Sequence, residues 1–174
     1  MSLTAEEVIE LLLLEPLPVE GGYYRVTYRA DETLDAATLP ERYGGSRATG
    51  GAIYYLLHGD HFSALHRLLT DEVYHFYLGQ PVEMLLLYPD GRDEVVRLGT
   101  DLAAGERVQA VVPRGVWQGS RLADRADGFA LMGTTMAPAY EQADFELGDR
   151  KELIAAYPQR ADLIRALTRE EGAA

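Results

Sequence analysis

The sequence contains no cysteine among its 174 residues. Disulfide bonds, thiolate metal ligands and cysteine nucleophiles are therefore excluded. Positive charge is also scarce, because 16 lysines and arginines stand against 28 aspartates and glutamates, for a formal net charge of −12. Since an acidic surface repels phosphate groups, neither nucleic-acid binding nor attachment to anionic lipid is expected.

Long hydrophobic runs are missing as well. The aliphatic run at residues 11–14 is far too short to cross a bilayer. Glutamates at positions 6, 7 and 10 precede it, whereas a secretory leader needs positive charge there. We therefore expect a cytoplasmic protein with no membrane partner.

The composition that remains is typical of a soluble globular protein, with 47% hydrophobic and 25% charged residues. Helices are predicted only near the two ends. Thr4 and Glu7 form a capping-box pattern for a short helix over residues 4–14, which Pro16 ends. Residues 150–168 return to helical spacing, and Pro158 divides them into two short helices.

The middle of the chain has the punctuation of β-structure, in which short segments rich in Tyr, Val, Leu and Thr are separated by Gly, Pro and Asp. This pattern favours an all-β sandwich or small barrel. The polar loop at residues 31–50 is long enough to suggest a pocket lid. The predicted strands are residues 23–29, 52–58, 63–69, 73–78, 82–88, 94–98, 107–112, 116–121 and 129–135.

All four histidines lie between residues 58 and 75, which invites a metal-site interpretation. Strand alternation argues against it, because His66 shares a face with Ala64 and Leu68. Glu72 shares a face with Tyr74 on the following strand, and His75 points to the opposite side. The histidine spacing therefore predicts no complete metal site.

Two stretches resemble the motifs of the cupin superfamily. Gly59, Leu65-His66-Arg67, Glu72 and Gly79 have the length of the first motif, and the segment from Pro113 to Gln118 resembles the second. The usual motif histidines are replaced by Leu65 and Arg67 in the first motif and by Gln118 in the second. This departure predicts that no tightly held transition metal is required.

Four ordered segments, at residues 18–30, 52–79, 111–119 and 132–147, resemble the cupin type 5 family over residues 6–168. Tyr74 stands where that family typically has tryptophan, and Ala139-Tyr140 where it has Gly-Phe. The resemblance implies a single domain with a double-stranded β-helix (jelly-roll), short terminal helices, a pocket between the two sheets and a homodimer. It implies no particular reaction.

The candidate catalytic residues are His66, Glu72 and Tyr74. For Glu72 the alternative is a solvated glutamate balanced by Arg67, and for His66 it is a structural core histidine. The remaining candidates are polar side chains expected at the wall or rim of the same pocket, as binding residues for a small polar ligand: Tyr23, Arg25, Tyr55, Ser63, Gln118 and Glu146.

Three functions remain open at this stage. An isomerase or epimerase acting on a sugar-like or carbonyl substrate would use His66 or Glu72 as base and Tyr23, Tyr55 or Tyr74 as acid. Sugar-nucleotide epimerases of the related fold use a histidine and a tyrosine in this way, which is an analogy of fold alone. A non-catalytic binding module would need only the pocket. A metal-dependent cupin enzyme would use His66 and Glu72 to hold a weakly bound divalent ion, and no other cofactor is expected.

Overall fold

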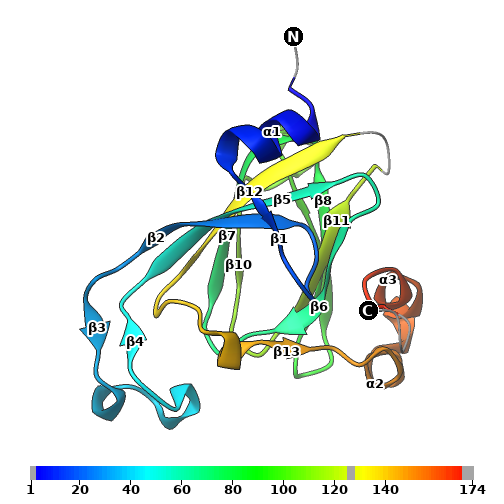
Figure 1. Ribbon diagram of the computed structural model, residues 1–174. Coiled ribbons are helices and arrows are strands. Elements are labelled where there is room, and N and C mark those ends of the chain that lie inside the picture. Colours follow the sequence, from blue (N-terminus) through cyan, green and yellow to red (C-terminus); the bar gives the residue numbers. More distant parts are fainter. Residues whose placement is uncertain (1–2, 125–127, 170–174) are drawn as a thin grey trace.

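In the computed structural model of the protein, residues 3–124 and 128–169 are described. Two antiparallel sheets face each other and close into a double-stranded β-helix, which confirms the expected all-β jelly-roll (Figure 1). The six-stranded sheet consists, in spatial order, of β1 (Glu15–Pro16), β2 (Tyr23–Arg29), β5 (Gly51–His58), β12 (Phe129–Met136), β7 (Glu72–Gly79) and β10 (Gln109–Val112).

The five-stranded sheet forms the opposite wall of the barrel. It brings parts of both cupin motifs together, because β6 carries His66, β11 carries Gln118, and the two strands pair with these residues opposite each other. The spatial order is β13 (Glu146–Leu147), β6 (Phe62–Arg67), β11 (Trp117–Leu122), β8 (Val82–Leu87) and β9 (Asp93–Leu98).

Helices cover the outer faces of the sheets. The α1 helix (Ala5–Leu12) has the predicted capping box at Thr4 and packs beside Leu56 and Leu131 of the six-stranded sheet. The α2 helix (Arg150–Ala156), the 3-10 turn η5 (Pro158–Arg160) and the α3 helix (Ala161–Ala166) pack on the five-stranded sheet (Figure 1). Within the described residues, no helix is long and apolar enough to cross a membrane.

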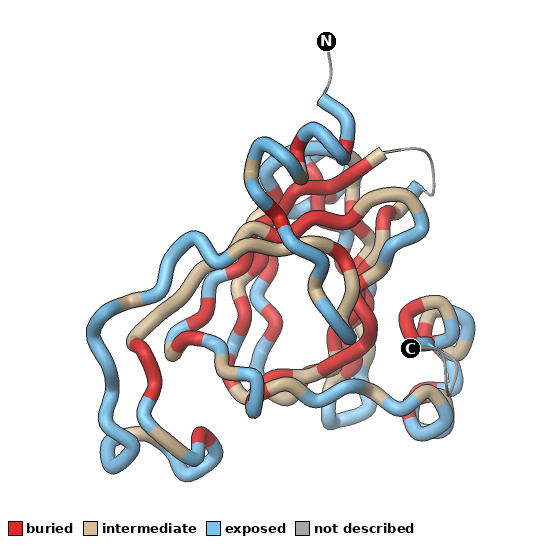
Figure 2. The backbone as a smooth tube through the Cα atoms, viewed as in Figure 1, coloured by how far each residue is buried: buried red, intermediate tan, exposed pale blue. Residues whose placement is uncertain are grey.

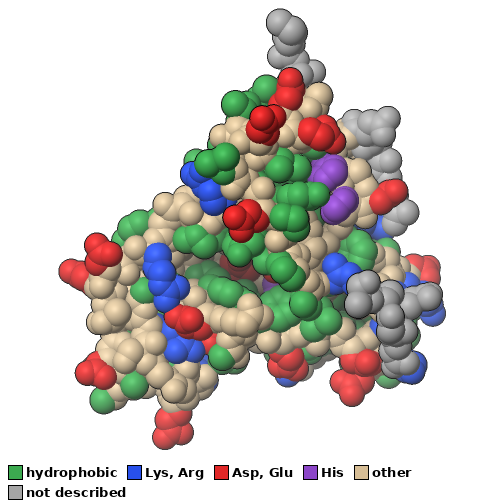
Figure 3. All heavy atoms as spheres, in the orientation of Figure 1, with side chains coloured by type: hydrophobic (Ala, Val, Ile, Leu, Met, Phe, Trp, Pro, Cys, Tyr) green, Lys and Arg blue, Asp and Glu red, His purple; other side chains and the backbone are tan. Residues whose placement is uncertain are grey.

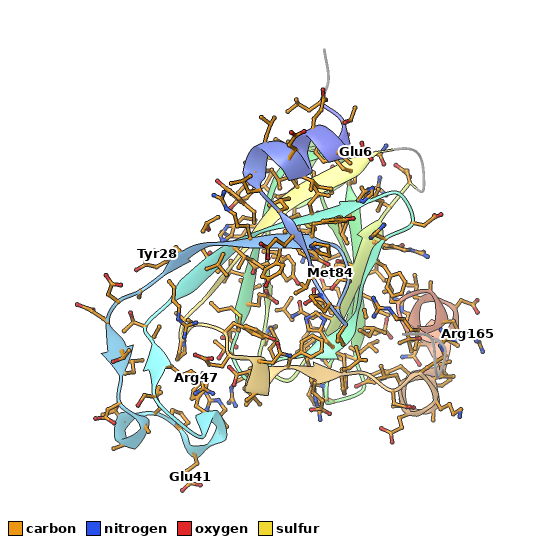
Figure 4. All side chains as sticks on the ribbon, in the orientation of Figure 1. Glu6, Tyr28, Glu41, Arg47, Met84 and Arg165 are labelled. Carbon is orange, nitrogen blue, oxygen red and sulfur yellow. The ribbon has the colours of Figure 1, made fainter. Side chains whose placement is uncertain are left out.

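The core lies between the two sheets, where strand alternation turns every second residue inward. On β7, the side chains of Tyr74 and Phe76 are buried while the intervening His75 is only half-buried. Met84 lies in the barrel interior (Figure 4). The buried segments of Figure 2 accordingly follow the barrel strands rather than the loops. Burying one such apolar side chain contributes about 1.5–3 kcal/mol.

All nine predicted strands are present, with ends that differ by one or two residues in most cases. The sequence pattern missed β1, β13 and the small ribbon of β3 (Thr33–Leu34) and β4 (Arg47–Ala48). Each of these strands has two residues, which is too few to display an alternation of apolar and polar positions. They are recognised as strands by their hydrogen bonds to a partner strand and not by a pattern in their own sequence.

The loop at residues 31–50 is not a pocket lid in this structure. It holds β3, β4 and two 3-10 turns, η1 (Ala36–Thr38) and η2 (Glu41–Tyr43), and forms an arm beside the barrel (Figure 1). Arg47 attaches the arm to η4 (Gln142–Asp144), since its Nη2 lies 2.9 Å from Oδ1 of Asp144 (Figure 4). Both side chains are buried.

The buried ion pair gives a stability prediction. Replacing Asp144 with alanine leaves the Arg47 guanidinium buried without its counter-charge, so we expect Asp144→Ala to lower the free energy of unfolding by about 3–5 kcal/mol. The matched control is Asp90→Ala, which removes an exposed pair with Arg92 and should lower the free energy of unfolding much less. Urea denaturation of both variants measures the difference, and equal losses would contradict the assignment.

The predicted homodimer can be tested in solution. The outer face of the six-stranded sheet leaves Tyr77 and Val111 about half exposed, and an uncovered apolar sheet face is a surface that a second copy can bury. We expect light scattering at micromolar concentration to give twice the 19.3 kDa mass of the chain. A mass of one chain would contradict this prediction.

Candidate functional site

A cavity of about 180 Å³ opens between the two sheets. Strands β2, β5, β7 and β12 supply one wall, and β6 with residues 139–145 supplies the other. Figure 3 shows the hollow on this face of the molecule, with apolar side chains around it. The volume lies below the roughly 300–1,000 Å³ of most ligand pockets, so the cavity suits a small molecule. Its ionisable groups include Glu20, His66 and Glu72.

Glu72 is the most constrained polar residue of the cavity. It is the first inward-facing residue of β7 and is 6% exposed. Gln118 reaches across from the other sheet, and its Nε2 donates to Oε2 of Glu72 at 2.7 Å. Burial raises the pKa of Glu72, assisted by the charge of Glu20 and opposed by His66. The carboxyl group therefore holds its proton to a higher pH than an ordinary glutamate.

His66 faces Glu72 from β6. Its Nδ1 lies 2.7 Å from the carbonyl oxygen of Ala64, and because a carbonyl can only accept, Nδ1 is the protonated nitrogen. The ring stacks on Phe145, with centroids 5.0 Å apart. Within the described part of the chain Nε2 has no hydrogen-bond partner, so this nitrogen is open to the cavity.

Glu20 lines the cavity although it was not among the predicted site residues. It sits in a turn where Gly21 and Gly22 have φ of +104° and +75°. A side chain at Gly22 would meet the Leu56 carbonyl oxygen at 2.8 Å, so glycine is required there. The Ser63 hydroxyl donates to Oε1 of Glu20 at 2.7 Å. The double glycine was the signal that could have identified this residue.

Tyr74 and Tyr55 are buried behind the polar groups rather than at the cavity wall. Burial raises the pKa of both phenols well above the usual value, with Glu72 adding to the effect at Tyr74 and Glu20 at Tyr55. The Tyr55 hydroxyl donates to the Gly21 carbonyl oxygen at 2.9 Å. Tyr74 therefore does not line the cavity, and its catalytic role stays a prediction, while Tyr55 and Ser63 hold the Glu20 turn.

Tyr23 and Arg25 do not reach the cavity. Tyr24 pairs with the inward-facing Tyr55 in the β2–β5 ladder, so both neighbours of Tyr24 project outward. Tyr23 packs near the rings of His58 and His61, and Arg25 lies over the ring of Tyr54. The prediction that Tyr23 and Arg25 lie at the pocket rim was wrong, because the inward face of β2 carries Tyr24 and not its two neighbours.

Glu146 also lies outside the cavity. Its two carboxylate oxygens accept hydrogen bonds from Arg67 at 2.7 and 2.8 Å, and the residue is exposed. It was predicted to bind ligand, and the structure places it instead in a surface ion pair. Because Arg67 is paired with Glu146, it does not balance the charge of Glu72 as the alternative interpretation required.

Three tyrosines that were not predicted line the cavity, namely Tyr24, Tyr28 and Tyr140. The Tyr140 hydroxyl donates to Gln142 at 3.1 Å. Burial raises the pKa of Tyr140 to about 12, and the charge of Glu20 contributes. The phenol of Tyr24 makes no hydrogen bond with any described residue. Tyr24 therefore takes the place in the wall that was expected for Tyr23.

The cavity does not fit a transition metal of the kind held in cupin folds. Among the described residues, no group of three or more carboxylate or imidazole side chains is placed to hold an ion. Gln118, at the position of a motif histidine, gives its amide to Glu72. His66 turns Nδ1 toward the backbone. A metal-dependent reaction therefore has no complete set of protein ligands here.

The geometry and the motifs agree with the comparison to known families. The model of the Cupin_5 family (Cupin superfamily, DUF985) matches residues 6–148. The chain belongs to this family. The match includes both cupin motifs, the Glu20 turn and the 139–145 segment of the cavity wall.

Similar structures cover nearly the whole chain. Protein SO0799 from Shewanella oneidensis is 38% identical with a TM-score of 0.84, and the alignment covers 98% of this chain and 100% of that one. A hypothetical protein from Leishmania major is 31% identical with a TM-score of 0.83, covering 97% and 100%. The uncharacterized protein YML079W of Saccharomyces cerevisiae is 28% identical over 132 residues. This alignment covers 72% of this chain and 66% of the yeast protein.

More distant structures share the fold alone. A dTDP sugar isomerase from Desulfovibrio desulfuricans is 20% identical with a TM-score of 0.50, over 78% of this chain and 80% of that one. Oxalate decarboxylase from Bacillus subtilis (an R92A mutant) is 12% identical with a TM-score of 0.52, over 92% and 41%. The cupin fold of this chain therefore occurs in proteins with different chemistry.

The raised pKa of Glu72 predicts a pH dependence of stability. Between the unfolded and folded pKa values the native state binds more protons, so this contribution to stability is lost as pH rises through the folded pKa. Each unit of increase in pKa corresponds to about 1.4 kcal/mol. We expect the free energy of unfolding of the wild type, relative to Glu72→Gln, to fall from pH 4.5 upward. Urea denaturation at several pH values checks this, and a constant difference would contradict it.

Proposed function

We propose that this cupin-family protein binds a small polar molecule in the barrel and catalyses an isomerase- or epimerase-type proton transfer next to a carbonyl group. The observation that carries the proposal is that the open Nε2 of His66 and the buried carboxyl of Glu72 belong to one small cavity. Such a site can remove a proton from carbon and return it, which is the chemistry these reactions need.

His66 and Tyr24 come from facing sheets, so a ligand in the cavity would lie between them. In the proposed reaction Nε2 of His66 takes the proton, and the electrons of the C–H bond form an enolate. The Tyr24 phenol then donates its proton to the other face of the same carbon. Return of the first proton through solvent restores both groups, so no oxidant or reductant is needed.

Glu72 would act on the oxygen of the substrate. A carboxyl group that keeps its proton can donate a hydrogen bond to the carbonyl oxygen, where negative charge develops in the enolate. Its raised pKa supports this role. The hydrogen bond from Gln118 holds the carboxyl group in position.

The test uses NMR to measure the exchange of substrate protons for deuterium in D2O. The substrates are a panel of small hydroxyaldehydes and hydroxyketones, with and without an amino group. We expect the wild type to exchange the proton next to the carbonyl, and His66→Ala and Tyr24→Phe to lower the rate about 10²–10⁴-fold. The matched controls are His75→Ala and Tyr23→Phe, which change residues outside the cavity and should leave the rate unchanged.

The alternative function is a non-catalytic binding module. The observation that favours it is that the same cavity offers fixed polar groups on an apolar wall without any catalytic metal set. Binding of panel compounds without exchange by the wild type would contradict the enzymatic proposal and favour the module. Equal exchange by wild type and His66→Ala would contradict the role of His66.

A further inference from the structure

The uncommitted polar atoms around the cavity are mainly hydrogen-bond acceptors. One carboxylate oxygen of Glu20 is bonded to Ser63, and the other has no partner among the described residues. Nε2 of His66 is open. Behind Glu72, the residue Gln118 is 2% exposed, and its buried Oε1 has no hydrogen-bond partner among the described residues. Buried acceptors of this kind are satisfied by a ligand or water that brings donors.

The Glu20 carboxylate forms no ion pair with an arginine or lysine in the described part of the chain, although Arg169 donates to the main-chain carbonyl oxygen of Glu20. Among the described lining residues Arg29 is the single arginine or lysine, and it is bonded to Glu141 and to the carbonyl oxygen of Tyr140. The charge of Glu20 raises the pKa of both Glu72 and Tyr140, so its field extends across the cavity. A phosphate or carboxylate ligand would have to overcome this field.

Aromatic rings line the same cavity as Glu20. Tyr24, Tyr28 and Tyr140 line the same cavity, and Tyr28 lies on β2 toward the arm (Figure 4). The face of an aromatic ring attracts a cation, and the attraction grows when the cation is partly shielded from water. A carboxylate with neighbouring phenol rings is a suitable environment for a protonated amine.

We propose that the ligand of this cavity carries a protonated amino group, which binds the free carboxylate oxygen of Glu20 beside Tyr24 and Tyr140. The inference rests on the proposed function for the location of the site, and it adds the substrate class. The amine lies at Glu20, and the uncharged remainder of the molecule extends toward His66 and Glu72. Phosphorylated sugars and sugar nucleotides are excluded by the same charges.

The experiment compares binding of matched compounds by NMR titration at pH 7.5. Two series are used, glucosamine with glucose and glucose 6-phosphate, and ethanolamine with ethylene glycol and glycolate. We expect the amine to bind about tenfold or more tightly than its neutral counterpart, as one charge-assisted hydrogen bond provides. The anion should bind most weakly. Raising the salt concentration should reduce the preference.

Two variants assign the preference to Glu20. Glu20→Gln keeps an oxygen for Ser63 but removes the charge, and it should abolish the preference for the amine. Glu146→Gln, which alters an exposed carboxylate outside the cavity, should retain it. An equal or stronger response to the anions, no response specific to the amines, or a preference that survives Glu20→Gln overturns the proposal.

This binding experiment is independent of catalysis. If amines bind through Glu20 but no compound exchanges deuterium, the catalytic proposal fails and the ligand class stands. If neutral or anionic compounds exchange at His66 without any amine preference, the ligand class fails and the catalytic proposal stands. The two results therefore separate the two proposals.

Discussion

The carboxyl group of Glu72 must be hydrogen-bonded because it is buried where the two sheets meet, and an unpaired carboxyl there would cost several kcal/mol. Gln118 meets this requirement from the facing sheet. Strand β7 of one sheet and β11 of the other must therefore be in correct register for this contact. Gln118 stands at the position of a motif histidine, and in this chain it hydrogen bonds to Glu72.

A second constraint is the turn that precedes β2. Its glycines have a backbone conformation that favours residues without a side chain, and the chain passes close to Leu56 and Phe62 there. Tyr55 and Ser63 bind this turn from two different strands. As a result Glu20 is held at the cavity although it belongs to a loop. The acidic character of the site depends on this turn as much as on the strands.

Side-chain alternation explains which predictions about the site were right and which were wrong. Glu72 was placed in the cavity correctly because the cupin motif marks its position on β7, and His66 because strand alternation puts it on one face of β6 with Ala64 rather than with Leu65 and Arg67. No motif marks the faces of β2, and a shift of one residue exchanges Tyr23 for Tyr24. Glu146 was misplaced for a different reason, since its pairing with Arg67 joins positions 79 residues apart.

The sequence by itself determined the nine long strands, the capped first helix, the divided helical end and the family, because these depend on local periodicity, turn residues and ordered motifs. Only the tertiary structure decided that Glu20 joins His66 and Glu72, that Tyr55 and Tyr74 serve as supports, and that residues 31–50 form an arm held by Arg47 and Asp144. Those arrangements depend on contacts between distant segments, and their energies come from burial and from hydrogen bonds across the barrel, which local sequence does not encode.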